Sequence, residues 1–119
     1  LYTIVRIKSI LSKYTEMGGD INTKVTIKDP SSDSEKNLML ELTKFNEVIE
    51  NSYNEIAPHK ICQYVYDLSN GFNKFYHETK IISEENKGKQ ESWIELLKLT
   101  KSVLEVSIDL LGLEAPKRM

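Results

Sequence analysis

The most continuous apolar pattern of the chain lies in residues 58–76. Pro58 stands where the first turn of a helix would be, a position at which its missing N–H costs nothing. Apolar residues then recur at alternating steps of three and four, at Ile61, Val65, Leu68, Phe72 and Phe75. This spacing predicts one long helix with a single buried stripe. A stripe of this length needs several partner helices to cover it.

Residues 1–14 predict a helix with two distinct faces. The apolar face, which we expect to pack inward, carries Ile4, Ile7, Leu11 and Tyr14. The opposite face carries Tyr2, Arg6, Ser9 and Lys13. A tyrosine one turn from an arginine can stack a nucleobase while the guanidinium contacts a phosphate. A solvated face on which Tyr2 shields a neighbour is the commoner outcome for such a pattern alone.

The next segment, residues 16–32, interrupts the helical pattern. Gly18 and Gly19 end the first helix. Residues 23–28 alternate like a short strand, but the chain offers no second strand to pair with it. We therefore predict an extended loop here.

A further helix is predicted from about residue 32 to residue 57. Ser32 and Glu35 have the spacing of a capping box, which marks its start. Two apolar registers meet at residues 44–46, so we expect a kink there. The polar side carries glutamates that should point away from any RNA, at positions Glu41, Glu47, Glu50 and Glu55.

The last helix is predicted over residues 90–111, after a polar loop at 78–89. Its apolar stripe includes Trp93 and runs to the end of the helix. Gly112 stands where a C-terminal cap is expected, and Pro116 follows shortly beyond. The whole chain is thus predicted to be an all-α bundle of four to five helices.

Composition narrows the function classes. A length of 119 residues suits one domain, and a net charge of −2 confines any polyanion site to a local patch. One cysteine, Cys62, excludes an internal disulfide, and we expect it to fill the core. His59 and His77 would lie about 27 Å apart on one helix and cannot share a metal ion. We expect no catalytic or metal-binding residue, and no apolar run is long enough to span a membrane.

Four stretches of the chain match one family pattern in order. Residues 57–76 are similar to P-H-x-L-x-x-Y-L-x-D-L-x-x-x-F-x-x-F-Y, and residues 110–119 to L-L-G-I-x-x-P-x-x-M. Residues 2–13 are similar to Y-x-x-x-R-I-x-S-I-x-x-K, and residues 38–48 more loosely to L-x-x-L-x-x-F-x-x-V-V. These stretches resemble the C-terminal, DALR-type anticodon-binding domain of arginyl-tRNA synthetases. The loop at 16–32 matches no part of that pattern.

The resemblance implies where RNA would bind. In this family the matching first-helix tyrosine and arginine, here Tyr2 and Arg6, face the anticodon loop. The tyrosine ending the F-x-x-F-Y run and the terminal methionine, here Tyr76 and Met119, lie near the same bases. Asn73, one turn before Tyr76, is a candidate for a hydrogen bond to a base edge. Because the chain is net acidic, we expect weak tRNA binding that relies on stacking and on a small local basic set, with a shallow salt dependence. That set is Arg6, Lys8, Lys13, Lys117 and Arg118.

The resemblance also implies a larger parent protein. Residues 1–119 would be one anticodon-binding domain, and we expect a fragment because residue 1 is a leucine already in helical pattern. The partners implied are the anticodon stem-loop of tRNA(Arg) and the parent's own catalytic domain, which would use ATP. This fragment itself would need no cofactor. We expect a cytoplasmic monomer that does not bind membranes.

Two alternatives remain open at this point. The first is a helical protein-interaction scaffold, in which Tyr2, Arg6 and Tyr76 would be scattered in space or buried. The second is the equivalent helical domain of another class I synthetase. The tRNA interpretation requires the three side chains to be clustered and open to solvent.

Overall fold

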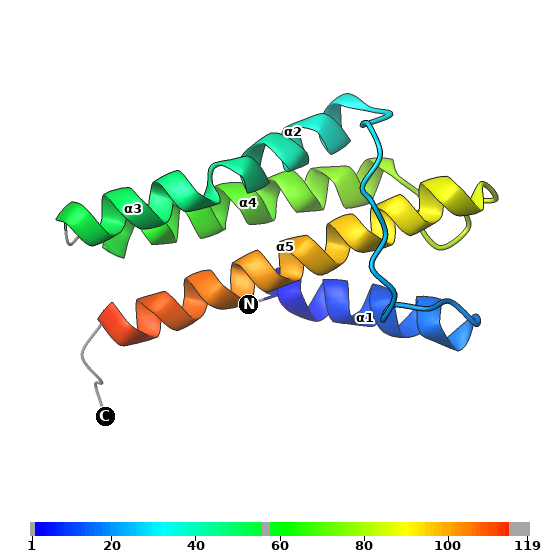
Figure 1. Ribbon diagram of the computed structural model, residues 1–119, viewed down its shortest axis with the longest axis horizontal. Helices are drawn as coiled ribbons and strands as arrows, with labels where there is room; N and C mark the ends of the chain where they lie inside the picture. Colours follow the sequence, from blue (N-terminus) through cyan, green and yellow to red (C-terminus); the bar gives the residue numbers. More distant parts are fainter. Residues whose placement is uncertain (1, 56–57, 115–119) are drawn as a thin grey trace.

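The protein is described from a computed structural model, which places residues 2–55 and 58–114. In that part of the chain the secondary structure is five α-helices without strands, and this confirms the predicted all-α bundle. The helices are α1 (Tyr2–Glu16), α2 (Asp33–Thr43), α3 (Phe45–Glu55), α4 (Pro58–Glu78) and α5 (Lys87–Glu114). Figure 1 shows α2 and α3 following one another along α4, with α5 drawn between this layer and α1, although α1 also contacts α4 directly.

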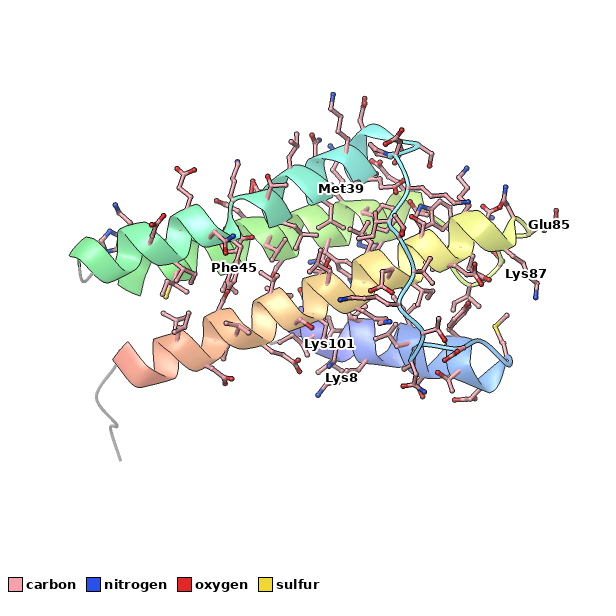
Figure 2. The ribbon with its side chains drawn as sticks, viewed as in Figure 1. Lys8, Met39, Phe45, Glu85, Lys87 and Lys101 are labelled. Carbon is pink, nitrogen blue, oxygen red and sulfur yellow. The ribbon has the colours of Figure 1, made fainter. Side chains whose placement is uncertain are left out.

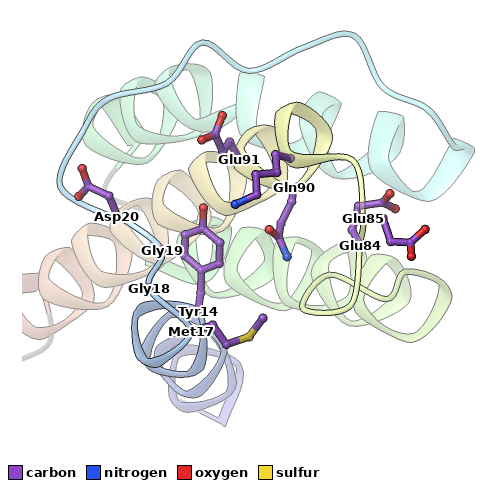
Figure 3. Close-up of a pocket in the computed structure, with 10 residues that line it drawn as sticks. Tyr14, Met17, Gly18, Gly19, Asp20, Glu84, Glu85, Gln90 and Glu91 are labelled. Carbon is purple, nitrogen blue, oxygen red and sulfur yellow. The ribbon is translucent and has the colours of Figure 1, made fainter.

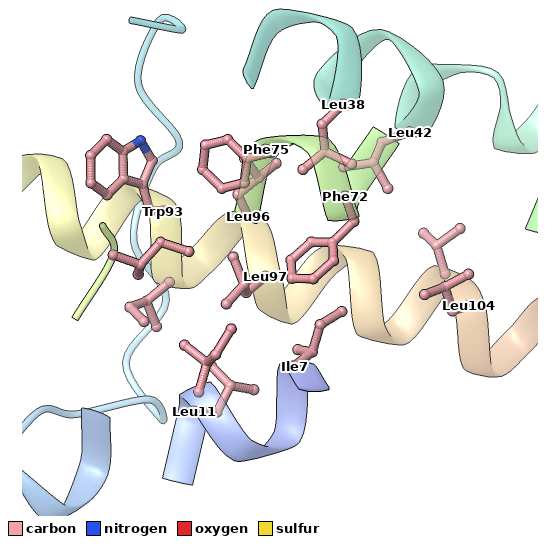
Figure 4. Packing of buried hydrophobic residues seen from close by; sticks show 14 of the residues in the cluster. Ile7, Leu11, Leu38, Leu42, Phe72, Phe75, Trp93, Leu96, Leu97 and Leu104 are labelled. Carbon is pink, nitrogen blue, oxygen red and sulfur yellow. The ribbon is translucent and has the colours of Figure 1, made fainter. Parts of the chain in front are cut away.

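The central helix is α4, which contacts each of the other four helices. Its predicted stripe is buried along most of its length, with Leu68, Phe72 and Phe75 inaccessible to solvent. Figure 4 shows Phe72 and Phe75 between side chains of α2 on one side and those of α1 and α5 on the other. The ring of Phe75 meets the indole of Trp93 edge-on at a centroid distance of 6.1 Å. The apolar pattern of residues 58–76 therefore predicted the core.

The predicted kink is a complete break between two helices. α2 ends at Thr43, and Phe45 opens α3 directly after it (Figure 2). The predicted start of α2 is confirmed. The Ser32 hydroxyl accepts a hydrogen bond from the backbone N–H of Glu35 at 3.2 Å. The cap and the register change in the sequence located both ends of this helix.

The loop at residues 17–32 is extended, as predicted. Figure 1 shows it crossing over α5 on its way from α1 to α2. Two backbone N–H groups fix it there: that of Val25 donates to the Glu95 carboxylate at 3.1 Å, and that of Lys28 to the Ser92 hydroxyl at 2.8 Å. Side chains of α5 therefore accept two hydrogen bonds that a second strand would otherwise have accepted.

The last helix is longer than predicted at both ends. It begins at Lys87 because Asn86 caps it, its side-chain oxygen accepting the backbone N–H of Lys89 at 3.0 Å. At the other end, the prediction that Gly112 stops the helix is wrong, since α5 continues to Glu114. A glycine inside a helix costs about 1 kcal/mol relative to alanine, and the buried stripe of α5 outweighs that cost.

The prediction that Cys62 fills the core is also wrong, because its side chain is exposed. It follows Ile61 by one residue and is therefore turned about 100° away from the buried stripe. Its place on the helix decides its burial, against the general tendency of cysteine. None of the described helices is both long and apolar enough to cross a membrane.

Candidate nucleic-acid interface

The guanidinium of Arg6 lies against two tyrosine rings. Its central carbon is 5.4 Å from the ring centroid of Tyr2 and 4.7 Å from that of Tyr76. Its Nη1 donates a hydrogen bond to the side-chain oxygen of Asn73 at 3.1 Å. Four of the predicted site residues therefore form one group, which we call the arginine–tyrosine cluster: Tyr2, Arg6, Asn73 and Tyr76.

Two helices build this cluster, each supplying two residues one turn apart. α1 presents Tyr2 and Arg6, and α4 presents Asn73 and Tyr76. The two helices contact one another directly, and the buried side chain of Ile7 anchors α1 in the core beside the cluster. The site therefore depends on the docking of α1 onto the central helix.

The two rings have different surroundings. Tyr2 is 77% exposed, whereas Tyr76 is partly buried. Tyr76 also contacts Phe72, nearly parallel at a centroid distance of 6.2 Å, and His77 at 5.4 Å. Tyr2 is thus the ring that a planar ligand can reach, and Tyr76 is held by its neighbours. The three side chains are thus clustered, but only Tyr2 is open to solvent, whereas Arg6 and Tyr76 are partly buried.

A hollow of about 380 Å³ adjoins the cluster where α4 ends. Tyr76 and His77 line it, together with Ile10 of α1 and residues 79–83 of the following loop. Sequence reasoning missed this hollow, because Ile10 belongs to neither face that the first-helix pattern defined. The loop itself is closed by Gln90, whose side-chain amide donates to the carbonyls of residues 81 and 82.

A second pocket, of about 520 Å³, lies at the other end of α1 and is acidic (Figure 3). Its carboxylates are those of Asp20, Glu84, Glu85 and Glu91. Burial, followed by the charges of Glu91 and Asp20, raises the pKa of Tyr14 in its wall. The hydrogen bond from Thr23 lowers the pKa of Asp20. Among the described residues, Lys87 is the one cation that lines this pocket beside four carboxylates, so the pocket disfavours a phosphate backbone.

The remaining predicted features are placed as follows. Met119 lies outside the described residues, and so do Lys117 and Arg118. Glu47 and Glu50 are exposed on α3, across the molecule from α1 in Figure 1. In residues 2–55 and 58–114, no three His, Cys, Asp or Glu side chains are grouped as metal ligands.

An open aromatic ring beside a guanidinium is a combination that can stack a nucleobase and contact a phosphate. Comparison with known proteins gives a more specific assignment. The family described as "DALR anticodon binding domain" matches residues 1–119. The chain therefore belongs to the DALR anticodon-binding domain family.

Three relatives of this chain have the name arginine–tRNA ligase. An arginine–tRNA ligase of Agathobacter rectalis is 60% identical over 120 residues, and one of Alkaliphilus oremlandii is 52% identical over 119 residues. An arginine–tRNA ligase of Francisella tularensis is 35% identical over 124 residues. Each match covers all of this chain but only 20% or 21% of the relative. The chain thus spans about a fifth of the length of these curated relatives.

Proposed function

We propose that this chain is the anticodon-binding part of an arginine–tRNA ligase and that it binds the anticodon stem-loop of tRNA(Arg). Its family and the names of its relatives support this assignment. The single observation that carries it is the arginine–tyrosine cluster, in which Arg6 contacts two tyrosine rings and Asn73 at an accessible surface. The chemistry of the parent enzyme, which attaches arginine to tRNA using ATP, takes place outside this chain. The parent acts in the cytoplasm, as a monomer.

The proposed binding mode follows from the physics of unpaired RNA. Anticodon bases are not held in a duplex, so they can splay out and stack on an exposed ring such as Tyr2. Each stack is worth about 1–3 kcal/mol. Arg6 adds a cation that contacts the RNA backbone, and the hollow beside Tyr76 has room for an unstacked base. Met119 would add an apolar contact to the same bases.

A binding titration tests the proposal. A hairpin with the anticodon stem and loop of tRNA(Arg) is labelled, and its fluorescence anisotropy is followed as the chain is added. We expect tighter binding than to a hairpin with the same stem and a scrambled loop. Equal affinity for both hairpins would overturn the proposal.

Two variants locate the site. Arg6→Gln should weaken binding by about ten-fold or more, because a contact to a charged group is worth roughly 1.5–3 kcal/mol. Lys36→Gln removes the same charge from an exposed position on α2 and should change the affinity by no more than about two-fold. Equal losses in the two variants would show that charge alone, and not the cluster, attracts the RNA. ATP-dependent attachment of arginine by the full-length parent tests the remainder of the proposal.

A further inference from the structure

Asn73 has a specific partner within the protein. The sequence made it a candidate for reading a base edge, but its side-chain oxygen accepts a hydrogen bond from Nη1 of Arg6 at 3.1 Å. We infer that Asn73 is a positioning residue, which orients Arg6 toward the RNA and does not read a base itself. This inference rests on the proposed function and assigns a role within the same site.

The identity of the atom that faces Arg6 follows from chemistry. A guanidinium carries only donors, so the Asn73 atom within hydrogen-bond distance of it must be the oxygen and not the amide nitrogen. An asparagine recognises adenine through two bonds at once, with its oxygen and its nitrogen both engaged. With the oxygen occupied by Arg6, that two-point contact is not possible unless Arg6 is released. In this arrangement Asn73 therefore accepts a hydrogen bond from Arg6 and is not available to recognise a base.

The same contact restricts the guanidinium. Arg6 is held at three points from two helices: the Tyr2 ring on its own helix, the Tyr76 ring, and the Asn73 oxygen on α4. An arginine held in this way has already lost much of the rotamer entropy that binding would otherwise cost. Its side chain is only partly buried, so a ligand can reach it. The planar donor edge of a guanidinium suits the oxygens of a phosphodiester.

A double-mutant cycle tests the inference. The affinity of the tRNA(Arg) stem-loop hairpin is measured for the unaltered chain, Asn73→Ala, Arg6→Gln and the double variant. If Asn73 acts through Arg6, Asn73→Ala should weaken binding about five-fold alone, but by less than about two-fold in the Arg6→Gln background. An equal loss in both backgrounds would show that Asn73 contacts the RNA independently and would overturn the inference.

The salt dependence of binding is a second measurement. It should change if Asn73 orients Arg6, and it should stay unchanged if Asn73 only stabilises the fold. Each phosphate contact to single-stranded RNA contributes about −0.7 to the slope of log K against log salt. Asn73→Ala should shift the slope toward that of Arg6→Gln, since a poorly oriented guanidinium makes the phosphate contact less often. A weakened affinity with an unchanged slope would contradict this expectation.

Controls separate folding from binding. Asn70→Ala removes an exposed amide one turn earlier on α4 and should leave the affinity unchanged within about two-fold. If Asn73→Ala does not fold, Asn73→Ser repeats the cycle, because serine lacks the amide oxygen but keeps a polar group.

If the unaltered chain shows no preference for the stem-loop over a scrambled loop, the proposed function falls and the inference with it. If it shows the preference and the two effects multiply, the inference alone falls.

Discussion

Tyr2 and Tyr76 both contact Arg6, yet their surroundings give them different tasks. Tyr76 has Phe72 and His77 against its ring in addition to Arg6. Tyr2 remains 77% exposed although Arg6 lies over it. A ring that is already contacted on several sides offers little area for a base. We therefore expect Tyr2 to be the main stacking surface and Tyr76 to support the guanidinium.

Substitution of Tyr2 tests this division of tasks. Tyr2→Ala should lower the affinity for the tRNA(Arg) stem-loop by about ten-fold, because a base–aromatic stack is worth roughly 1–3 kcal/mol. Tyr2→Phe keeps the ring and should stay within about two-fold of the unaltered chain. Anisotropy titrations with the labelled hairpin measure both. The matched control is Tyr66→Ala, which removes a tyrosine of α4 that is 64% exposed. An equal loss in the control would contradict the assignment to the cluster.

Only part of the site could be predicted from the sequence. The apolar face of the first helix placed Tyr2 and Arg6 outward, and the family resemblance singled out Tyr76. The bond between Arg6 and Asn73 joins residues 67 positions apart, and no local pattern reports such a contact. The error at Cys62 was avoidable from the sequence. We expected it to be buried because cysteines usually are, although its angular position on α4 places it outside the apolar stripe.

Among the helices, the start of α2 depends on one buried carboxylate. Glu35 is only 2% exposed, and its Oε1 accepts hydrogen bonds from the backbone N–H and hydroxyl of Ser31 and from the indole of Trp93. This carboxylate joins the helix start to α5. The spacing of Ser32 and Glu35 predicted the cap, whereas the bond to Trp93 spans 58 positions and was not predictable.

Loss of this carboxylate should destabilise the fold. Glu35→Ala leaves the buried indole N–H of Trp93 without an acceptor, which typically costs about 1–3 kcal/mol, and removes the two bonds to exposed Ser31. We expect the free energy of unfolding to fall by about 2–3 kcal/mol. Urea unfolding followed by circular dichroism and by the fluorescence of Trp93, the single tryptophan, measures it. Asp33→Ala, an exposed carboxylate in the same first turn, should cost no more than about 0.5 kcal/mol. Equal losses would contradict the role of Glu35.

The packing of α4 against α2 should make stability sensitive to alkaline pH. The Tyr64 hydroxyl donates to the backbone carbonyl of Glu41 at 2.7 Å, and burial, then the Glu41 charge, raises the pKa of Tyr64 above its usual value near 10. The folded state therefore keeps this proton where the unfolded chain loses it. Stability from this group is complete below about pH 10 and is lost as the pH rises further.

Tyr64→Phe tests this pH dependence. The substitution removes one hydrogen bond, so the free energy of unfolding should fall by about 1 kcal/mol at neutral pH. Between about pH 8 and about pH 10.5 the variant should lose less stability than the unaltered chain. Urea midpoints at both pH values measure the difference. Part of the loss should persist, because the pKa of Tyr14 is raised as well. Identical losses in the two proteins would exclude Tyr64 as the source.

For the whole molecule, the apolar patterns predicted the fold class and the core of α4 but not how the helices pack together. A pattern shows which face of a helix is buried, but not which helix covers it. The position of α1 on α4, which assembles the cluster, came only from the resemblance. The acidic pocket at the opposite end of α1 from the cluster could not be predicted either, because residues 14–20 and 84–91 build it together. Glu84 and Glu85 of this pocket directly follow residues 79–83, which line the hollow beside Tyr76, so the proposed RNA surface has carboxylates at one edge.

The net charge of −2 leads to the last prediction. The chain is net acidic and the cluster supplies one guanidinium, so we expect one or two phosphate contacts, each contributing about −0.7 to the salt slope. Raising the salt from about 50 to about 200 mM should then weaken binding of a tRNA(Arg) transcript by roughly three- to seven-fold. Proteins with six to ten phosphate contacts lose about 10³- to 10⁵-fold over that range. Titrations at the two salt concentrations distinguish these cases, and Lys36→Gln should leave the slope unchanged. A steep slope together with submicromolar affinity would mean that an extended cationic surface, and not stacking at Tyr2, dominates binding.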